Sequence, residues 1–230
     1  AVNSMDNTIR VWNLESGGFE TELQPGTLQS WKIKWMKDGK SIITGGDSGD
    51  LKIIPFADNP EGVPSSEIHT TKGKYILSVD HSSQAGLIAC GNSEGAVFIV
   101  DVEKGKCVKK FENHGMAVRD VAFSRDGNTL ITVSDDAHIA VIDTKQLSRV
   151  QTLTGHTSWI TSVEITSGGT EFFTGGMDKT VRHWDLRAQK TIQSIQAHQD
   201  TIWDIKLSPD DNYLLTASDD KTGNIYAKVQ

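Results

Sequence analysis

One short pattern returns along the chain at a nearly constant interval. It is clearest at 178–185 (DKTVRHWD) and at 6–13 (DNTIRVWN), and weaker copies occur elsewhere. The positions equivalent to Trp184 are 12, 54, 100, 142, 184 and 226, which gives spacings of 42, 46, 42, 42 and 42 residues. His114, His156 and His198 are also 42 residues apart. Two landmarks that share one period indicate a chain made of repeated structural units.

Each repeat predicts four short strands separated by turns. In the fifth repeat, the apolar and turn residues place strands at 160–166, 171–175, 180–186 and 191–195. No window shows the sustained period of a helix. Four strands in each repeat of 42 residues are typical of one blade of a β-propeller. The sequence therefore predicts an all-β propeller of four-stranded antiparallel blades, in a single domain that covers 1–230.

Polar side chains recur at fixed positions of the last three repeats. They are His156, Thr174 and Asp178 with Trp184 in the fifth repeat, His114, Thr132 and Asp136 with Ile142 in the fourth, and His198, Thr216 and Asp220 with Tyr226 in the sixth. Half-buried His and Asp side chains need hydrogen-bond partners. We therefore expect a chain of hydrogen bonds from Asp through His to Thr, and on to the indole N–H where Trp is present. The second and third repeats have Ser48 and Glu94 at the Asp position without a His partner, so we expect them to rely on apolar packing.

These residues resemble the structural tetrads of WD-repeat proteins, and the resemblance covers essentially all 230 residues. Within that family the chain resembles the WD-repeat subunit of the Ski (superkiller) complex, which in animals also associates with the Paf complex. The similar segments are 6–17, 71–79, 155–160 and 198–203.

Propellers of this kind have seven blades, and the last blade borrows its outer strand from the N-terminal segment. The chain has half a repeat at 6–23, four full repeats, and a last repeat that ends at its third strand. The resemblance therefore implies a seven-bladed ring from which roughly one and a half blades are absent at the N-terminus.

The resemblance also implies a non-catalytic scaffold for protein–protein interaction. In the Ski complex the propeller holds a tetratricopeptide-repeat subunit beside the helicase that feeds messenger RNA to the exosome. The implied role is cytoplasmic mRNA decay, with a transcription role through the Paf complex and a nuclear location as second expectations. The alternative is a substrate-recognition adaptor of a ubiquitin ligase. Reading a phosphorylated degron needs several Arg side chains at one end of the channel, and only Arg119 is at a matching position.

Composition and spacing argue against other classes of site. The net charge of −7 disfavours direct nucleic-acid binding, and the four Lys within 104–110 fall on a short turn between two strands. No apolar stretch reaches the roughly 20 residues that span a membrane.

The His–Asp–Thr sets resemble a hydrolase triad, but they occur three times in register where an enzyme has one. The remaining His residues lack metal-ligand spacing, and no glycine-rich phosphate loop is present. We expect no catalytic residue, no metal and no cofactor.

The first strand of each repeat contains an irregularity that points to a binding surface. Core positions such as Ile160 and Val163 are three residues apart, whereas a regular strand returns to one face at every second residue. We therefore predict a bulge, which redirects neighbouring side chains toward one end of the propeller, the top face. The predicted partner-binding residues there are Trp31, Tyr75, Leu77, Arg119, Trp159, Met177 and Trp203, with Met5, Gln29, Asp47, Ala117, Asp135, Thr161, Thr201 and Asp219 beside them. Trp, Arg and Met are frequent at binding surfaces. The alternative is that each Trp covers its own blade as part of the core.

Overall fold

The computed structural model describes residues 1–4, 6–24, 30–37, 39–56, 64–70 and 73–227. Its regular structure consists of β-strands. No helix within the described ranges is long and apolar enough to cross a membrane. The buried strands are rich in Val and Ile, as in Ala96–Asp101 (AVFIVD), because branched side chains suit a pleated surface that is covered on both faces.

The strands form six antiparallel sheets, which we number in chain order, and each sheet is an up-and-down meander. Three described strands form each end sheet, namely β1 (Val2–Asn3), β2 (Ile9–Trp12) and β3 (Phe19–Leu23) in sheet 1, and β20 (Ile202–Leu207), β21 (Tyr213–Ser218) and β22 (Gly223–Ala227) in sheet 6. The other four sheets have four strands each. Sheet 2 consists of β4 (Ser30–Trp35), β5 (Ser41–Gly46), β6 (Asp50–Pro55) and β7 (Ser66–His69), and sheet 3 of β8 (Ile76–Ser82), β9 (Leu87–Asn92), β10 (Ala96–Asp101) and β11 (Lys106–Glu112). Sheet 4 consists of β12 (Val118–Phe123), β13 (Thr129–Ser134), β14 (His138–Asp143) and β15 (Ser148–Thr154), and sheet 5 of β16 (Ile160–Ile165), β17 (Glu171–Gly176), β18 (Thr180–Asp185) and β19 (Lys190–Gln196).

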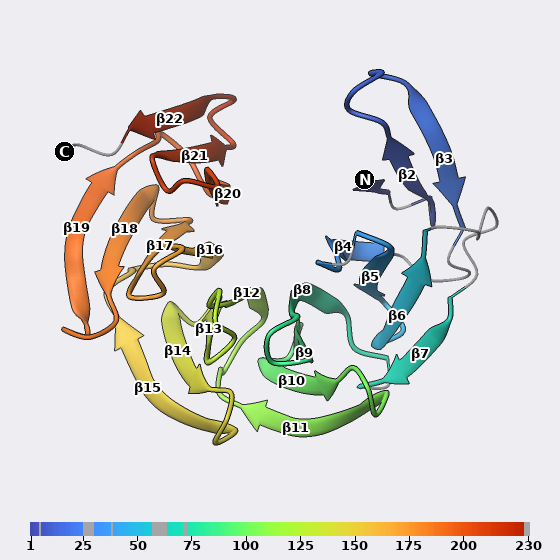
Figure 1. The fold of residues 1–230 in the computed structure, drawn as a ribbon. Helices are drawn as coiled ribbons and strands as arrows, with labels where there is room; N and C mark the ends of the chain where they lie inside the picture. The colour runs from blue at the N-terminus through green and yellow to red at the C-terminus, as the bar shows by residue number, and fades with distance from the viewer. Residues whose placement is uncertain (5, 25–29, 38, 57–63, 71–72, 228–230) are drawn as a thin grey trace.

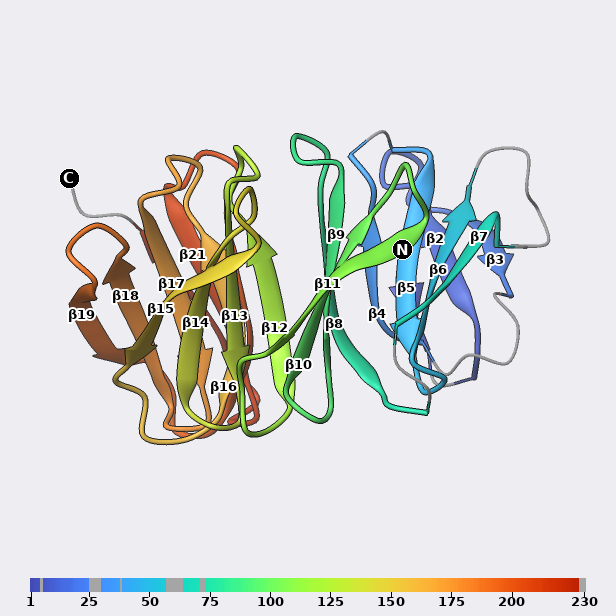
Figure 2. The ribbon, with the colours of Figure 1, turned by 90° about the horizontal axis from the view of Figure 1, so that it is seen from below.

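The six sheets are arranged like blades around a central axis (Figure 1). The first strand of each complete sheet lies nearest the axis and the fourth lies outermost, and an opening separates sheet 6 from sheet 1. The strands run between two ends, where the connecting loops gather (Figure 2). The predicted all-β propeller with four-stranded antiparallel blades is confirmed, but the structure has six sheets and not the seven that the resemblance implies. Sheet 1 is also larger than the predicted half repeat, because β1 adds a strand before 6–23.

Apolar side chains fill the space between neighbouring sheets. Ile131 and Val141 of sheet 4 belong to one buried cluster with Ile160, Phe172 and Trp184 of sheet 5. The same repeat positions face each other in the other pairs of neighbours, so each sheet needs a sheet on either side to bury its two faces. Burying one such side chain stabilises the fold by about 1.5–3 kcal/mol.

Hydrogen bonds between inner strands add a directional contact. The Asp80 carboxylate accepts the Phe123 N–H at 2.8 Å, and the Asp120 carboxylate accepts the Val163 N–H at 3.2 Å. In each case the carboxylate comes from one sheet and the N–H from the sheet that follows. These contacts fix the spacing of the inner strands around the axis.

The predicted bulge is present near the beginning of the inner strands. Register with the second strand shifts between Ile160 and Ser162 in β16, and at the equivalent positions of β4, β8, β12 and β20. One residue in each strand is therefore left out of the pairing. Those five residues are Trp31, Leu77, Arg119, Thr161 and Trp203.

Candidate functional site

The most complete polar network lies in sheet 5. The Asp178 carboxylate lies 2.8 Å from His156 Nδ1, so Nδ1 carries the proton and donates it. His156 Nε2 then accepts from the Thr174 hydroxyl at 2.7 Å, and the Trp184 indole N–H donates to Thr174 Oγ1 at 2.8 Å. The structure brings all four predicted residues together in the predicted order.

The network is shorter in sheet 4. His114 Nε2 lies 2.8 Å from Thr132 Oγ1, and its Nδ1 lies 3.2 Å from Asp136. Ile142 occupies the position of Trp184 and has no donor, so the chain ends at Thr132. A comparison of sheets 4 and 5 can therefore measure how much the indole N–H contributes to stability.

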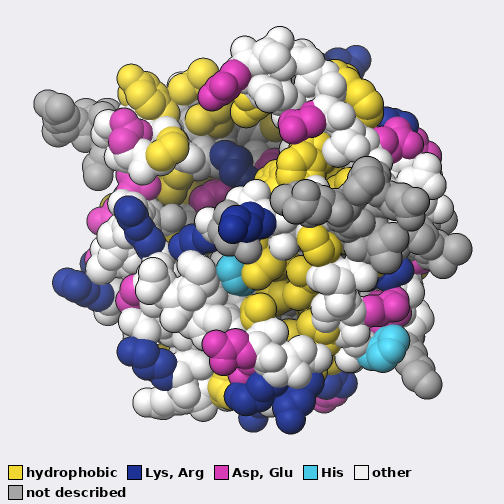
Figure 3. All heavy atoms as spheres, turned by 45° about the vertical axis from the view of Figure 1, so that its right-hand side comes forward, with side chains coloured by type: hydrophobic (Ala, Val, Ile, Leu, Met, Phe, Trp, Pro, Cys, Tyr) yellow, Lys and Arg dark blue, Asp and Glu magenta, His cyan; other side chains and the backbone are white. Residues whose placement is uncertain are grey.

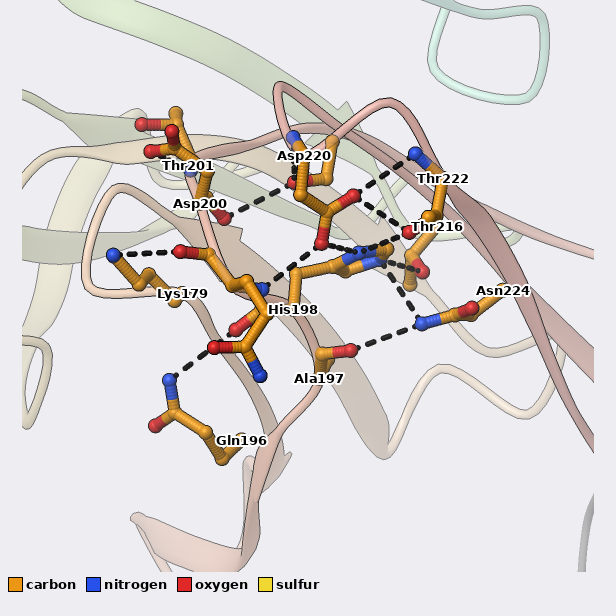
Figure 4. A network of polar contacts seen from close by, with 12 residues as sticks. Lys179, Gln196, Ala197, His198, Asp200, Thr201, Thr216, Asp220, Thr222 and Asn224 are labelled. Carbon is orange, nitrogen blue, oxygen red and sulfur yellow. Dashed lines mark hydrogen bonds and ion pairs between the residues drawn. The ribbon is translucent and has the colours of Figure 1, made fainter.

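Sheet 6 contains a third network, around His198, Thr216 and Asp220 (Figure 4). His198 Nε2 lies 2.7 Å from Thr216 Oγ1, and Nδ1 lies 2.9 Å from Asp220. Tyr226 stands at the Trp position, but its hydroxyl donates to the Ala197 carbonyl at 3.2 Å. Tyr226 therefore does not extend the network, because its hydroxyl reaches past Thr216 to the backbone.

Sheets 2 and 3 have no His–Asp pair at the equivalent positions of the sequence. In sheet 2 the hydroxyls of Ser30 and Thr44 lie 2.5 Å apart. In sheet 3 the buried Cys90 stands at the Thr position. Sheet 2 contributes Ile and Leu side chains, and sheet 3 Ile and Val side chains, to one buried cluster.

The carboxylates of the networks remain ionised at neutral pH. Burial raises the pKa of Asp178, but hydrogen bonds from His156, Thr180 and the Thr157 N–H outweigh it and lower the pKa to about 2. The same balance holds the pKa of Asp136 well below its usual range. The Thr174 and Thr132 hydroxyls are fully buried, so no substrate can reach them. These clusters therefore connect the strands within each blade.

The top face, where the inner strands begin, carries exposed aromatic side chains. Trp31 is 48% exposed, Tyr75 44% and Trp203 45%. Met116, which the sequence analysis missed, is 46% exposed. Its exposure could have been predicted, because Met116 is adjacent in sequence to Ala117, which was assigned to this face. Met5 and Gln29 lie outside the described residues.

Most of the other residues assigned to the top face are less accessible, although Asp219 is exposed. Leu77 is only 8% exposed and Thr161 only 6%. Assigning Leu77 to the binding surface was therefore wrong. A bulge redirects side chains, but each neighbouring sheet decides whether the redirected side chain reaches solvent. Trp159 and Met177 are half-buried.

Arg119 is held in place on both sides. Its guanidinium forms two hydrogen bonds of 2.8 Å to the Asp135 carboxylate, and it lies 5.1 Å from the centre of the Trp159 ring. Asp135 is buried, so this pair is firmly positioned. Because Asp135 already neutralises Arg119, this side chain is poorly suited to capture a phosphorylated degron.

The central channel contains a cavity of about 330 Å³ lined by charged side chains of the inner strands. Lys34 lies 2.8 Å from Asp80, and Lys206 forms an ion pair with Glu164. Burial lowers the pKa of Lys206, but the carboxylates around it outweigh burial and raise it. The described residues contain no group of three His, Cys, Asp or Glu side chains positioned to hold a metal ion.

Comparison with known proteins agrees with this architecture. The family model described as "WD domain, G-beta repeat" matches residues 105–143, 147–185 and 189–226, which together make up half of the chain. The WD repeat-containing protein SL1-17 of Schistosoma mansoni is 30% identical over 139 residues, which cover 60% of this chain and 44% of that protein.

Two further relatives show similar identity. The WD repeat-containing protein VIP3 of Arabidopsis thaliana is 30% identical over 138 residues, covering 54% of this chain and 42% of that protein. The meiotic recombination protein rec14 of Schizosaccharomyces pombe is 30% identical over 131 residues, covering 56% and 42%. The matches span less than half the length of these relatives. With half of its residues matched to the family model and six sheets of the blade type, the chain belongs to the WD-repeat family.

Proposed function

We propose that this chain is a non-catalytic protein-interaction scaffold that binds its partner through the top face. The observation that carries the proposal is the exposure of Trp31, Tyr75 and Trp203 at the same end of the inner strands. Burying an exposed aromatic side chain is a main source of free energy in protein association. The half-buried Trp159, which is fixed by Arg119, adds a rigid aromatic surface beside them.

The specific role is that of the WD-repeat subunit of a Ski-type complex in cytoplasmic mRNA decay, with a second role in the nucleus through the Paf complex. Its partners are then a tetratricopeptide-repeat subunit and a helicase. The support is the resemblance at 155–160 and 198–203, and Trp159 and Trp203 lie within these segments.

The test replaces Trp203 or Trp31 by alanine and measures affinity for the tetratricopeptide-repeat subunit by calorimetry. Each change should weaken binding by about 2 kcal/mol, because a hot-spot ring loses its buried contact. Ile192→Ala is the matched control, since Ile192 is 49% exposed on the outer strand β19. Unchanged affinity in both Trp variants, with melting temperatures like the wild type, would place the interface elsewhere.

We also propose that the six sheets occupy six positions of a seven-membered ring. Leu215 and Ile225 of sheet 6 are 43% and 69% exposed, whereas Ile131 and Val141 at the same repeat positions of sheet 4 are 0% and 7% exposed. Trp12 of sheet 1 is likewise exposed where Trp184 is buried. The two sheets beside the opening therefore present faces that are covered in sheet 4.

Electron microscopy of the protein isolated from its native source counts the blades directly. Views down the channel should show seven blades, because one further sheet would cover both exposed faces. Six blades around an opening would contradict the seven-membered ring.

A further inference from the structure

Sheet 6 lies beside the opening of the propeller, and one of its two faces is uncovered. Leu215 and Ile225 on that face are exposed, and hydrophobic side chains are visible at this end of the ring in Figure 3. On the other face, Ile205 and Leu214 pack in a buried cluster with Val181 of sheet 5. Of the described sheets, sheet 5 is therefore the one that holds sheet 6 in place.

Polar contacts along the inner strands join the same two sheets. Near the top face, the Thr161 hydroxyl of β16 donates to the Ile202 carbonyl of β20. Further down these strands, Lys206 forms an ion pair with Glu164. Trp203 directly follows Ile202, so the contact with Thr161 fixes the backbone next to this exposed ring.

A further contact joins the lower ends of these strands, opposite the top face. The Asp211 carboxylate accepts the Ser167 N–H at 2.7 Å and the Ser167 hydroxyl at 2.5 Å. Ser167 belongs to the turn that follows β16, and Asp211 to the turn that follows β20. Among the described residues, no hydrogen bond joins the equivalent turns of sheets 3 and 4 or of sheets 4 and 5. The contact thus sets sheets 5 and 6 apart from the two preceding pairs.

The backbone of Asp211 shows that its side chain is kept at a conformational cost. Its φ of 57° lies in the left-handed region, and its N–H closes the turn by donating to the Ser208 carbonyl at 2.9 Å. The repeat equivalents are Gly39, Gly127 and Gly169, with φ of 65°, 73° and 69°. Glycine adopts this conformation more easily than a residue with a Cβ atom. A residue that stays in a strained conformation often has a specific role, and the role visible here is the contact with Ser167.

We propose that the contact between Ser167 and Asp211 is a latch that positions Trp203 from the opposite end of the propeller. With the latch closed, β20 is held against sheet 5 at both ends, which fixes Trp203 relative to Trp159. With the latch open, the lower end of sheet 6 moves away from sheet 5 and β20 pivots about its upper contact. Ser167 is exposed, so a negative charge placed there repels Asp211 and opens the latch. Asp211 is thus a positioning residue for the top face, and its effect on partner affinity rests on the function proposed above.

Hydrogen exchange tests the latch directly. Asp211→Gly copies Gly169, so it keeps the turn and relieves the strain while it removes the carboxylate. Exchange of the Ser167 amide should rise about tenfold, because its hydrogen bond is lost. Asp210→Gly is the matched control, since it copies Gly168 and removes a neighbouring carboxylate that bonds within its own turn. The control should leave exchange at Ser167 unchanged.

The position of Trp203 is measured by NMR of the indole N–H groups, of which the chain has six. Asp211→Gly should shift or broaden the Trp203 signal and leave the Trp31 signal in place, and Trp203→Phe and Trp31→Phe assign the two signals. Ser167→Asp should act like Asp211→Gly, because two carboxylates then face each other. Asp210→Gly should move neither signal.

The outcomes separate the latch from the proposed binding site. Unchanged exchange at Ser167 in Asp211→Gly would overturn the latch. Faster exchange with an unmoved Trp203 signal would overturn its role in positioning. Affinity for the tetratricopeptide-repeat subunit, measured by calorimetry, should fall about threefold in Asp211→Gly. A shifted Trp203 signal with unchanged affinity would support the latch and count against Trp203 as a binding residue.

Discussion

Replacing Trp184 by alanine is expected to lower the free energy of unfolding by about 3–5 kcal/mol. The side chain is 1% exposed, and its ring stacks on Phe172 with centres 5.8 Å apart. It belongs to the cluster that joins sheet 4 to sheet 5, so its removal leaves a cavity at that interface. It also donates the hydrogen bond to Thr174 that completes the network.

Urea unfolding followed by circular dichroism measures this loss. Trp31→Ala is the matched control, because it removes the same side chain from an exposed position and should cost less than about 1 kcal/mol. The control also shows that top-face variants keep their fold. Similar losses in the two variants would mean that Trp184 does not pack between the sheets as described.

Replacing Thr174 by valine is expected to cost about 2–4 kcal/mol. Valine keeps the shape of threonine but has no hydroxyl. The change leaves His156 Nε2 and the Trp184 indole N–H without their partner, and both groups are buried. Each unpaired buried group costs about 1–3 kcal/mol, and the two are not fully additive because they share one network.

Thr132→Val in sheet 4 provides the comparison. Its hydroxyl has only His114 as a side-chain partner, because Ile142 has no donor. The loss should therefore be about 1–3 kcal/mol, smaller than for Thr174. The same denaturation experiment measures both variants. An equal loss at the two sites would show that the indole hydrogen bond adds nothing to stability.

The repeat period was sufficient to predict most of the scaffold. The 42-residue spacing placed His156, Thr174, Asp178 and Trp184 at equivalent points of a blade, and their chemistry then required the observed order of contacts. The separation of Ile160 from Val163 was sufficient to predict the bulge. Both inferences depend on strand geometry, which acts over a few residues and repeats along the chain.

Side-chain contacts between strands could not be predicted in the same way. The pairing of Arg119 with Asp135 and the burial of Leu77 depend on how side chains from different strands meet. The absence of Tyr226 from the network of sheet 6 depends on the reach of its hydroxyl group, which donates to the Ala197 carbonyl. The repeat period predicts which positions are equivalent, but it does not predict which contacts the side chains at those positions make.

The bulge in the inner strands has an evolutionary consequence. The five bulge residues are Trp31, Leu77, Arg119, Thr161 and Trp203, whereas the position before them is apolar in four of the five strands and always buried. A residue left out of strand pairing can be exchanged without disturbing the alternation that builds the core. Successive copies of the repeat have thus diverged at this position while keeping the same blade. A propeller of this kind can acquire new partners by mutation at the bulge positions that reach solvent, such as Trp31 and Trp203, with little loss of stability.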